Sequence, residues 1–248
     1  MIGDGFAVRS LALTLRDGSE ISAHRHGWGQ LVYARSGTIE ALTGDGMWFA
    51  PATRAIWIPA ALDHRLRCRG EVALRTLYLA PGLAAPLSAV GTIEVVPLLR
   101  ELIVHITRLG MLHPDNPAEA RLAAVLVDLL SDARREQLQL PLPRDGRARS
   151  VAERLIAAPA DQARNATLAR DAGASLRSLQ RLFLHETGLT LEAWRRQARL
   201  LHAITLLTAG DGMVAVALGC GYTSTSAFSA AFRRTFGLAP SSYRGARE

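Results

Sequence analysis

The sequence predicts an α+β protein of two domains, with a β-rich domain in front and an all-α domain behind it. Three observations predict this division. Short runs of β-branched and aromatic residues end near Leu79, helical periodicity begins near Pro97, and the positive charge is confined to residues 144–248. At 248 residues the chain is long enough for two domains with separate hydrophobic cores.

The front domain, residues 1–82, is predicted to be a compact β sandwich or barrel. Its apolar runs are short, as in QLVYA, GTIEALTG and AIWIP, and they alternate with turn signals such as DG, SG and GDG. Closely spaced short strands of this kind are typical of sandwiches and small barrels.

Residues 83–143 are predicted to be a helical connector, because apolar residues recur every three or four positions in 97–109 and 117–138. The apolar stripe of the second segment consists of Leu122, Val125, Leu126, Leu129 and Ala133. This stripe suits packing on the β domain and packing on a second copy in a homodimer, and the sequence leaves both open. Pro, Gly and charged residues in 140–150 then indicate a linker.

The charge is distributed unevenly. Residues 1–143 hold 14 arginines and 14 acidic residues, whereas residues 144–248 hold 15 arginines and 8 acidic residues and so account for the whole net charge of +7. A basic excess confined to one domain indicates a polyanionic partner such as DNA. The two cysteines are far apart, and neither a leader nor a membrane-length apolar run is recognised, so we expect a cytoplasmic protein without a membrane partner.

The back domain contains an internal repeat, in residues 168–195 and 216–244. Its matched pairs are Gly173 with Gly221, Phe183 with Phe232, Gly188 with Gly237, and Trp194 with Tyr243. Each copy has the pattern of a helix-turn-helix: a short helix, a glycine turn, a capping Ser or Thr, and a second helix that ends at glycine. A long helix over about 191–208 is predicted to join the copies, so that both second helices enter successive major grooves.

The second helix of each copy carries the candidate base contacts. The candidates in the first copy are Arg177, Ser178, Gln180 and Arg181. The candidates in the second copy are Ser224, Thr225, Ser226 and Ser229. Arg and Gln suit guanine and adenine edges, whereas short hydroxyls make few bidentate contacts. We therefore expect the first copy to recognise base sequence, and the second to contribute mainly phosphate contacts and shape readout.

From about Ser150 to Arg244 the chain resembles the DNA-binding domain of the AraC/XylS family of bacterial regulators. GCGYTSTSAFSAAFRRTFG is similar to the second unit of that domain, and GLAPSSYR is similar to its C-terminal signature. The resemblance implies a two-unit domain over 144–248, with double-stranded promoter DNA and RNA polymerase as partners. Whether it activates or represses stays open. Ala230 stands where the family often has an arginine.

The front domain resembles the metal-binding cupins, which are jelly-roll barrels. The segment H-x-H-x3-Q runs from His24 through His26 to Gln30, and P-x4-H ends at His64 with Ala61 in place of a turn glycine. On a strand, positions 24 and 26 would share one face. The resemblance implies that the three histidines hold a divalent ion, with Gln30 at the position of the usual carboxylate. Three imidazoles suit Zn, Ni or Cu, and the alternative is an effector pocket without metal.

Together these features favour a sequence-specific transcriptional regulator that responds to a small molecule or metal in its front domain, and we expect no enzymatic activity. The alternative is a metal-dependent cupin enzyme, an oxygenase or isomerase, fused to a DNA-binding domain. The sequence shows neither paired catalytic carboxylates nor a nucleophile elbow, and the neutral Gln30 weakens a redox-iron site.

Overall fold

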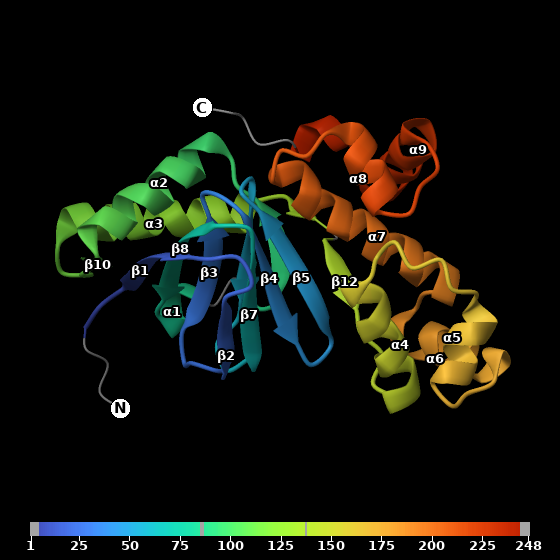
Figure 1. Cartoon of the computed structure of the whole chain (residues 1–248). Helices are drawn as coiled ribbons and strands as arrows, with labels where there is room; N and C mark the ends of the chain where they lie inside the picture. The colour runs from blue at the N-terminus through green and yellow to red at the C-terminus, as the bar shows by residue number, and fades with distance from the viewer. Residues whose placement is uncertain (1–4, 85–86, 137, 244–248) are drawn as a thin grey trace. The chain divides into compact units, whose positions relative to one another are not determined.

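The computed structural model describes residues 5–84, 87–136 and 138–243, and the chain separates into two compact units. The N-terminal unit comprises residues 1–43 and 48–139, and the C-terminal unit comprises residues 44–47 and 140–248. Figure 1 shows both β strands and helices in the blue to green part of the chain and only helices in its orange to red part. A β-rich domain followed by an all-α domain, as predicted, is confirmed.

Two antiparallel sheets form the frame of the N-terminal unit. The larger sheet has the strand order β10-β1-β8-β3-β6-β9-β11, and the smaller contains β5-β4-β7-β2. The strands are β1 Val8–Leu15, β2 Glu20–His24, β3 Gly29–Ala34, β4 Thr38–Thr43, β5 Gly46–Pro51, β6 Arg54–Ile58, β7 His64–Arg69, β8 Val72–Leu79, β9 Gly91–Glu94, β10 Met111–Leu112 and β11 Arg135–Glu136. Of the two forms that the sequence left open, the described strands make a sandwich of two separate sheets, with no closed barrel among them.

One hydrophobic core lies between the two sheets. Val32 and Ile56 of the larger sheet and Ile39 and Leu66 of the smaller one are fully or almost fully buried in it. Because successive strand residues point to opposite faces, every second residue of β7 enters this space, beginning with His64. The first residue of β7 therefore brings a polar ring to one end of an apolar interior.

The other face of the larger sheet is covered by helices (Figure 1). These helices are α1 Pro81–Ala84, α2 Pro97–Leu109 and α3 Pro117–Asp132. Leu31 and Leu77 of the sheet share a second core with Ile103 of α2 and Leu126 of α3. The predicted connector helices thus pack on the β strands of their own chain. Val125, also in the predicted stripe, stays 44% exposed.

The C-terminal unit is helical. Its elements are α4 Gly146–Ala157, α5 Asn165–Asp171, α6 Leu176–Thr187, α7 Leu191–Thr208, α8 Met213–Gly219, α9 Thr225–Phe236 and the short 3-10 helix η1 Pro240–Tyr243. Strand β12 Gln139–Pro141 begins at the last residue of the N-terminal unit and continues into this one. The aromatic members of the repeat lie in its core. The ring centroids of Phe183 and Trp194 are 5.3 Å apart, and those of Phe232 and Tyr243 are 5.5 Å apart. The joining helix predicted over about 191–208 is confirmed as α7.

Both helix-turn-helix turns have the predicted form. Gly173 and Gly221 adopt φ of 68° and 74°, a left-handed conformation that favours glycine. Ser175 caps α6, and Ser224 caps α9. The repeat therefore marks equivalent turns and caps. No described helix is long and apolar enough to cross a membrane.

Candidate functional site

Helix α6 presents a polar outer face. Leu179 and Phe183 are buried in the core of the unit, and this fixes the rotation of the helix. Arg177, Gln180 and Arg181 are consequently exposed, at positions that lie three and four residues apart on one side. These long donor and acceptor side chains extend toward solvent, where a DNA groove could receive them.

The cap of α6 occupies two serine hydroxyls. The Ser175 Oγ accepts from the backbone N–H of Ser178 at 3.1 Å and donates to or accepts from the Ser178 Oγ at 2.9 Å. Ser178 is only partly exposed. Its hydroxyl therefore holds the start of the helix, and the sequence pattern alone did not separate this role from base contact.

Helix α9 offers fewer polar atoms. The Ser224 Oγ accepts from the Ala227 N–H at 3.2 Å, so that hydroxyl is engaged in the cap. Thr225 and Ser229 are half-buried, and Ser226 is exposed. The structure also places Arg233 and Arg234 exposed in the last turn of α9, two cations that were not among the sequence candidates.

In the N-terminal unit, His24, His26 and His64 come together. One ring nitrogen from each lies within 4.8 Å of the others. His24 ends β2 and pairs across the sheet with His64 of β7. His26, however, lies beyond the end of the strand, so the expectation that a shared strand face aligns His24 with His26 is wrong. The loop after β2 turns His26 toward the other two rings instead.

All three rings are oriented in the same way. Their Nδ1 atoms lie 2.8, 2.6 and 2.8 Å from the backbone oxygens of Ser22, Trp28 and Leu62. A carbonyl oxygen only accepts, so each Nδ1 carries a proton, and the neutral form of each ring then has its lone pair on Nε2. Burial lowers the pKa of His64 to about 4, which keeps that ring neutral. Neutral imidazole is the form that binds a metal.

Gln30 joins this cluster from the larger sheet. Its Oε1 lies 3.0 Å from the Nε2 atoms of both His26 and His64, and its Nε2 donates to Thr76 Oγ1 and Tyr78 Oη, each at 3.1 Å. When both rings are neutral, the two Nε2 lone pairs and the Gln30 carbonyl oxygen repel one another. The contact becomes attractive when a cation lies among these atoms, or when the amide is turned over so that its NH2 group donates to both rings.

His26 lies in the loop after β2, His64 follows directly after the loop that precedes β7, and one backbone hydrogen bond joins these two loops. The Ala61 N–H donates to the His26 oxygen at 2.8 Å. Ala61 has φ of 63°, the one left-handed residue other than glycine among the described residues. The sequence marked this position because alanine replaces a turn glycine there, and the structure shows that the left-handed turn is kept.

The two helix-turn-helix units define the class of protein: a DNA-binding protein of the helix-turn-helix type. A family model described as "Helix-turn-helix domain" matches residues 168–246. The HTH-type transcriptional regulator NimR of Escherichia coli (strain K12) is 31% identical over 220 residues, which cover 89% of this chain and 81% of NimR. The chain belongs to the AraC/XylS family of transcriptional regulators.

Other relatives match over shorter stretches. The HTH-type transcriptional regulator RipA of Corynebacterium glutamicum is 40% identical over 103 residues, 42% of this chain and 31% of RipA. Among solved structures, unsaturated fatty acid-bound ToxT of Vibrio cholerae matches with a TM-score of 0.42 and 11% identity, over 98% of this chain and 96% of ToxT.

Proposed function

We propose that this regulator recognises promoter DNA mainly through α6 and that occupation of the histidine cluster changes its binding to DNA. Arg177, Gln180 and Arg181 would contact base edges, and α9 would add phosphate contacts and shape readout. The observation that carries the sensing role is the common orientation of the three imidazoles, since each Nδ1 is tied to a backbone oxygen. Such outer hydrogen bonds orient histidine ligands at metal sites.

The donor set fits a first-row divalent ion. His24, His26 and His64 would hold it through Nε2, with the Gln30 Oε1 beside them as a neutral oxygen donor. Three imidazoles suit Zn, Ni or Cu, whereas the absence of a carboxylate from this set disfavours a redox-active iron. When bound, such an ion supplies a positive charge and an open coordination position at which a small molecule with a donor atom can bind.

Gln30 also supports a second proposal, an effector pocket without metal. With its amide turned over, Gln30 would donate to both Nε2 atoms and accept from Thr76 or Tyr78, so the cluster would be satisfied without a cation. In either case the relatives named above are transcriptional regulators, which supports sensing rather than turnover. Conversion of a ligand by metal-loaded protein would favour the cupin enzyme instead.

Two protein partners complete the proposal. RNA polymerase is the partner through which a promoter-bound regulator changes transcription. Homodimerisation stays a prediction. Val125 is the member of the α3 stripe that remains for it, since Leu126 is buried in the monomer and Leu122, Leu129 and Ala133 pack against the same core. Sedimentation of the full chain with and without DNA would determine the oligomeric state.

The sensing site is tested by elemental analysis and DNA affinity together. We expect tag-free protein to retain about one equivalent of a divalent metal, and His26→Ala to lose both the metal and the metal-dependent change in DNA affinity. His105→Ala, at an exposed position of α2, is the control and should behave as wild type. If metal-free wild-type protein responds to its effector without change, metal has no part in the mechanism. The effector pocket without metal is then the remaining proposal.

A further inference from the structure

A pocket of about 300 Å³ lies within the C-terminal unit, where elements of the two helix-turn-helix units meet. It is lined by Gln162, Asn165, Glu192, Arg195, Arg196, Arg199 and Tyr222. The first unit contributes the loop before α5 and the start of that helix, α7 contributes the three arginines, and the second unit contributes its turn. Three guanidinium groups and a single carboxylate make this pocket positive.

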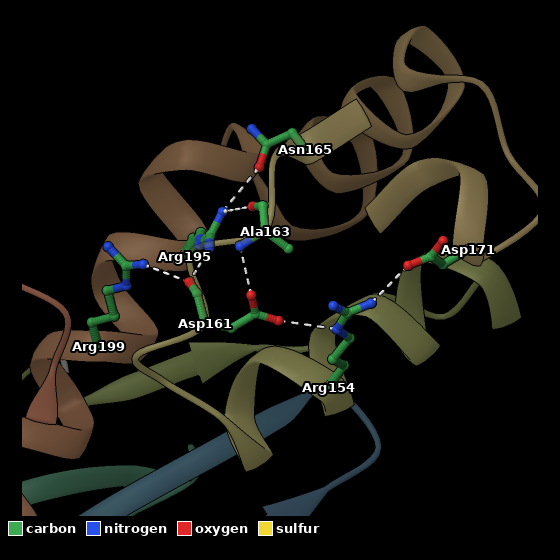
Figure 2. A network of polar contacts seen from close by, with 7 residues as sticks. All are labelled: Arg154, Asp161, Ala163, Asn165, Asp171, Arg195 and Arg199. Carbon is green, nitrogen blue, oxygen red and sulfur yellow. Dashed lines mark hydrogen bonds and ion pairs between the residues drawn. The ribbon is translucent and has the colours of Figure 1, made fainter. Parts of the chain in front are cut away.

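Two of the arginines are fixed by partners that carry no charge. Arg199 donates to the backbone oxygens of Pro159 at 2.9 Å and Asp161 at 2.8 Å. Arg195 donates to the oxygens of Ala163 at 2.8 Å and Asp161 (Figure 2). Backbone oxygens hold these guanidinium groups in place without neutralising them. Burial and the nearby Arg199 lower the pKa of Arg195, so an added negative charge would be favourable there.

The other charged residues in and beside the pocket do not neutralise its positive charge. The Glu192 Oε1 accepts from the Asn165 Nδ2 at 2.7 Å. The Asp161 carboxylate, next to the pocket, is engaged by Arg154 at 3.0 Å and by a backbone N–H (Figure 2). Arg196 is exposed and has no hydrogen bond or ion pair with any described residue. One guanidinium group is therefore available to an anion from outside.

The pocket lies at the joint between the units. Gln162 Nε2 donates to the Gly221 oxygen at 3.2 Å, which connects the loop of the first unit to the turn of the second. A Cβ on Gly221 would come within 2.7 Å of Gln162 Nε2, so glycine permits this close approach. When a duplex accepts both recognition helices in successive major grooves, backbone phosphates of that duplex lie between the two helices.

We propose that this pocket binds a backbone phosphate of the DNA between the two half-sites. The proposal rests on the proposed function, since it requires both units to engage one duplex. A phosphate oxyanion would accept from Arg196 and neutralise part of the charge of Arg195 and Arg199. This contact would hold the duplex at the joint without recognising its base sequence.

The test measures the salt dependence of DNA binding for wild type, Arg196→Gln and the control Arg121→Gln, an exposed arginine of α3. The probes are a duplex selected from a random pool by the full chain and a random-sequence duplex of equal length. We expect Arg196→Gln to weaken binding to both duplexes by the same factor and to reduce the slope of log affinity against log salt by about one. Arg121→Gln should retain the wild-type slope.

Two results would overturn the proposal. The first is that Arg196→Gln binds DNA with the same affinity and the same salt dependence as wild type. The other is saturable binding of inorganic phosphate at constant ionic strength that Arg196→Gln abolishes while its DNA slope is unchanged, since the pocket would then serve a free anion. Failure of the wild-type chain to prefer the selected duplex would instead contradict the proposed function itself.

Discussion

The polar side chains of the two recognition helices divide into those engaged in helix caps and those left exposed. Ser178 and Ser224 have polar groups at recognition-helix positions, but their cap hydrogen bonds stabilise α6 and α9. Arg177, Gln180 and Arg181 are exposed and engage no described residue. These three side chains are therefore accessible to DNA, and their contact with base edges is part of the proposed function.

Arg181→Ala is expected to weaken binding to the selected duplex by about 1–3 kcal/mol and to relax its preference at one base pair. The reason is that arginine can donate two parallel hydrogen bonds to guanine. Competition binding against duplexes substituted one base pair at a time measures both effects. An equal loss on random DNA would show that Arg181 contacts phosphate only.

Ala61→Gly is expected to raise the free energy of unfolding by up to ~1 kcal/mol, because the left-handed conformation strains alanine but not glycine. Ala60→Gly is the matched control, since this neighbour is exposed and does not have positive φ. The control should lose about 0.5–1 kcal/mol through the greater entropy of the unfolded chain. Denaturant titration of both variants gives the comparison, and equal losses would mean that Ala61 is unstrained.

Among the helices and strands, the sequence correctly predicted the features that depend on residues close together in the chain. Caps, turn glycines and apolar periodicity determined α6, α7 and α9, because each depends on neighbours in sequence. Strand partners could not be predicted in this way. β1 pairs with β8 and with β10, and these pairings depend on chain segments far apart in sequence.

The two candidate sites differ in how far the sequence predicted them. The resemblance to the cupin motifs implied that His24, His26 and His64 converge, although His26 reaches the cluster from a loop rather than from the strand. The arginine pocket was not predicted, because the backbone oxygens that hold Arg195 and Arg199 come from a loop more than 30 residues earlier. The one signal in the sequence was the close spacing of Arg195, Arg196 and Arg199 in the segment that forms α7.

The cap of α6 provides a prediction at this scale. Ser175→Ala is expected to cost about 1 kcal/mol of stability in the C-terminal unit, because it leaves the Ser178 N–H without its acceptor. Ser175→Thr should restore most of the loss, and Ser241→Ala, at an exposed position of η1, should cost little. Urea unfolding followed by tryptophan fluorescence measures these differences. A loss as large for Ser241→Ala would show that the cap has no special role.

For the whole molecule, the distribution of charge corresponds to the division of labour. The half without net charge contains the histidine cluster, and the half with all of the excess contains both helix-turn-helix units and the arginine pocket. The charge distribution thus separates the DNA-binding half of the chain from the half that contains the histidine cluster. It could not show which arginines are neutralised within the protein, because that depends on the tertiary partners of each guanidinium group.

The recognition helices α6 and α9 differ in their exposed side chains and are joined in one chain by α7, so the binding site on DNA should have a direction. A symmetric dimer recognises a palindrome and binds equally well after its site is reversed. One copy of this chain, with arginines and glutamine on α6 and short hydroxyls on α9, has no such symmetry. Its operator should therefore consist of one well-defined half and one degenerate half. Inverting that operator would turn the regulator around relative to the start of transcription.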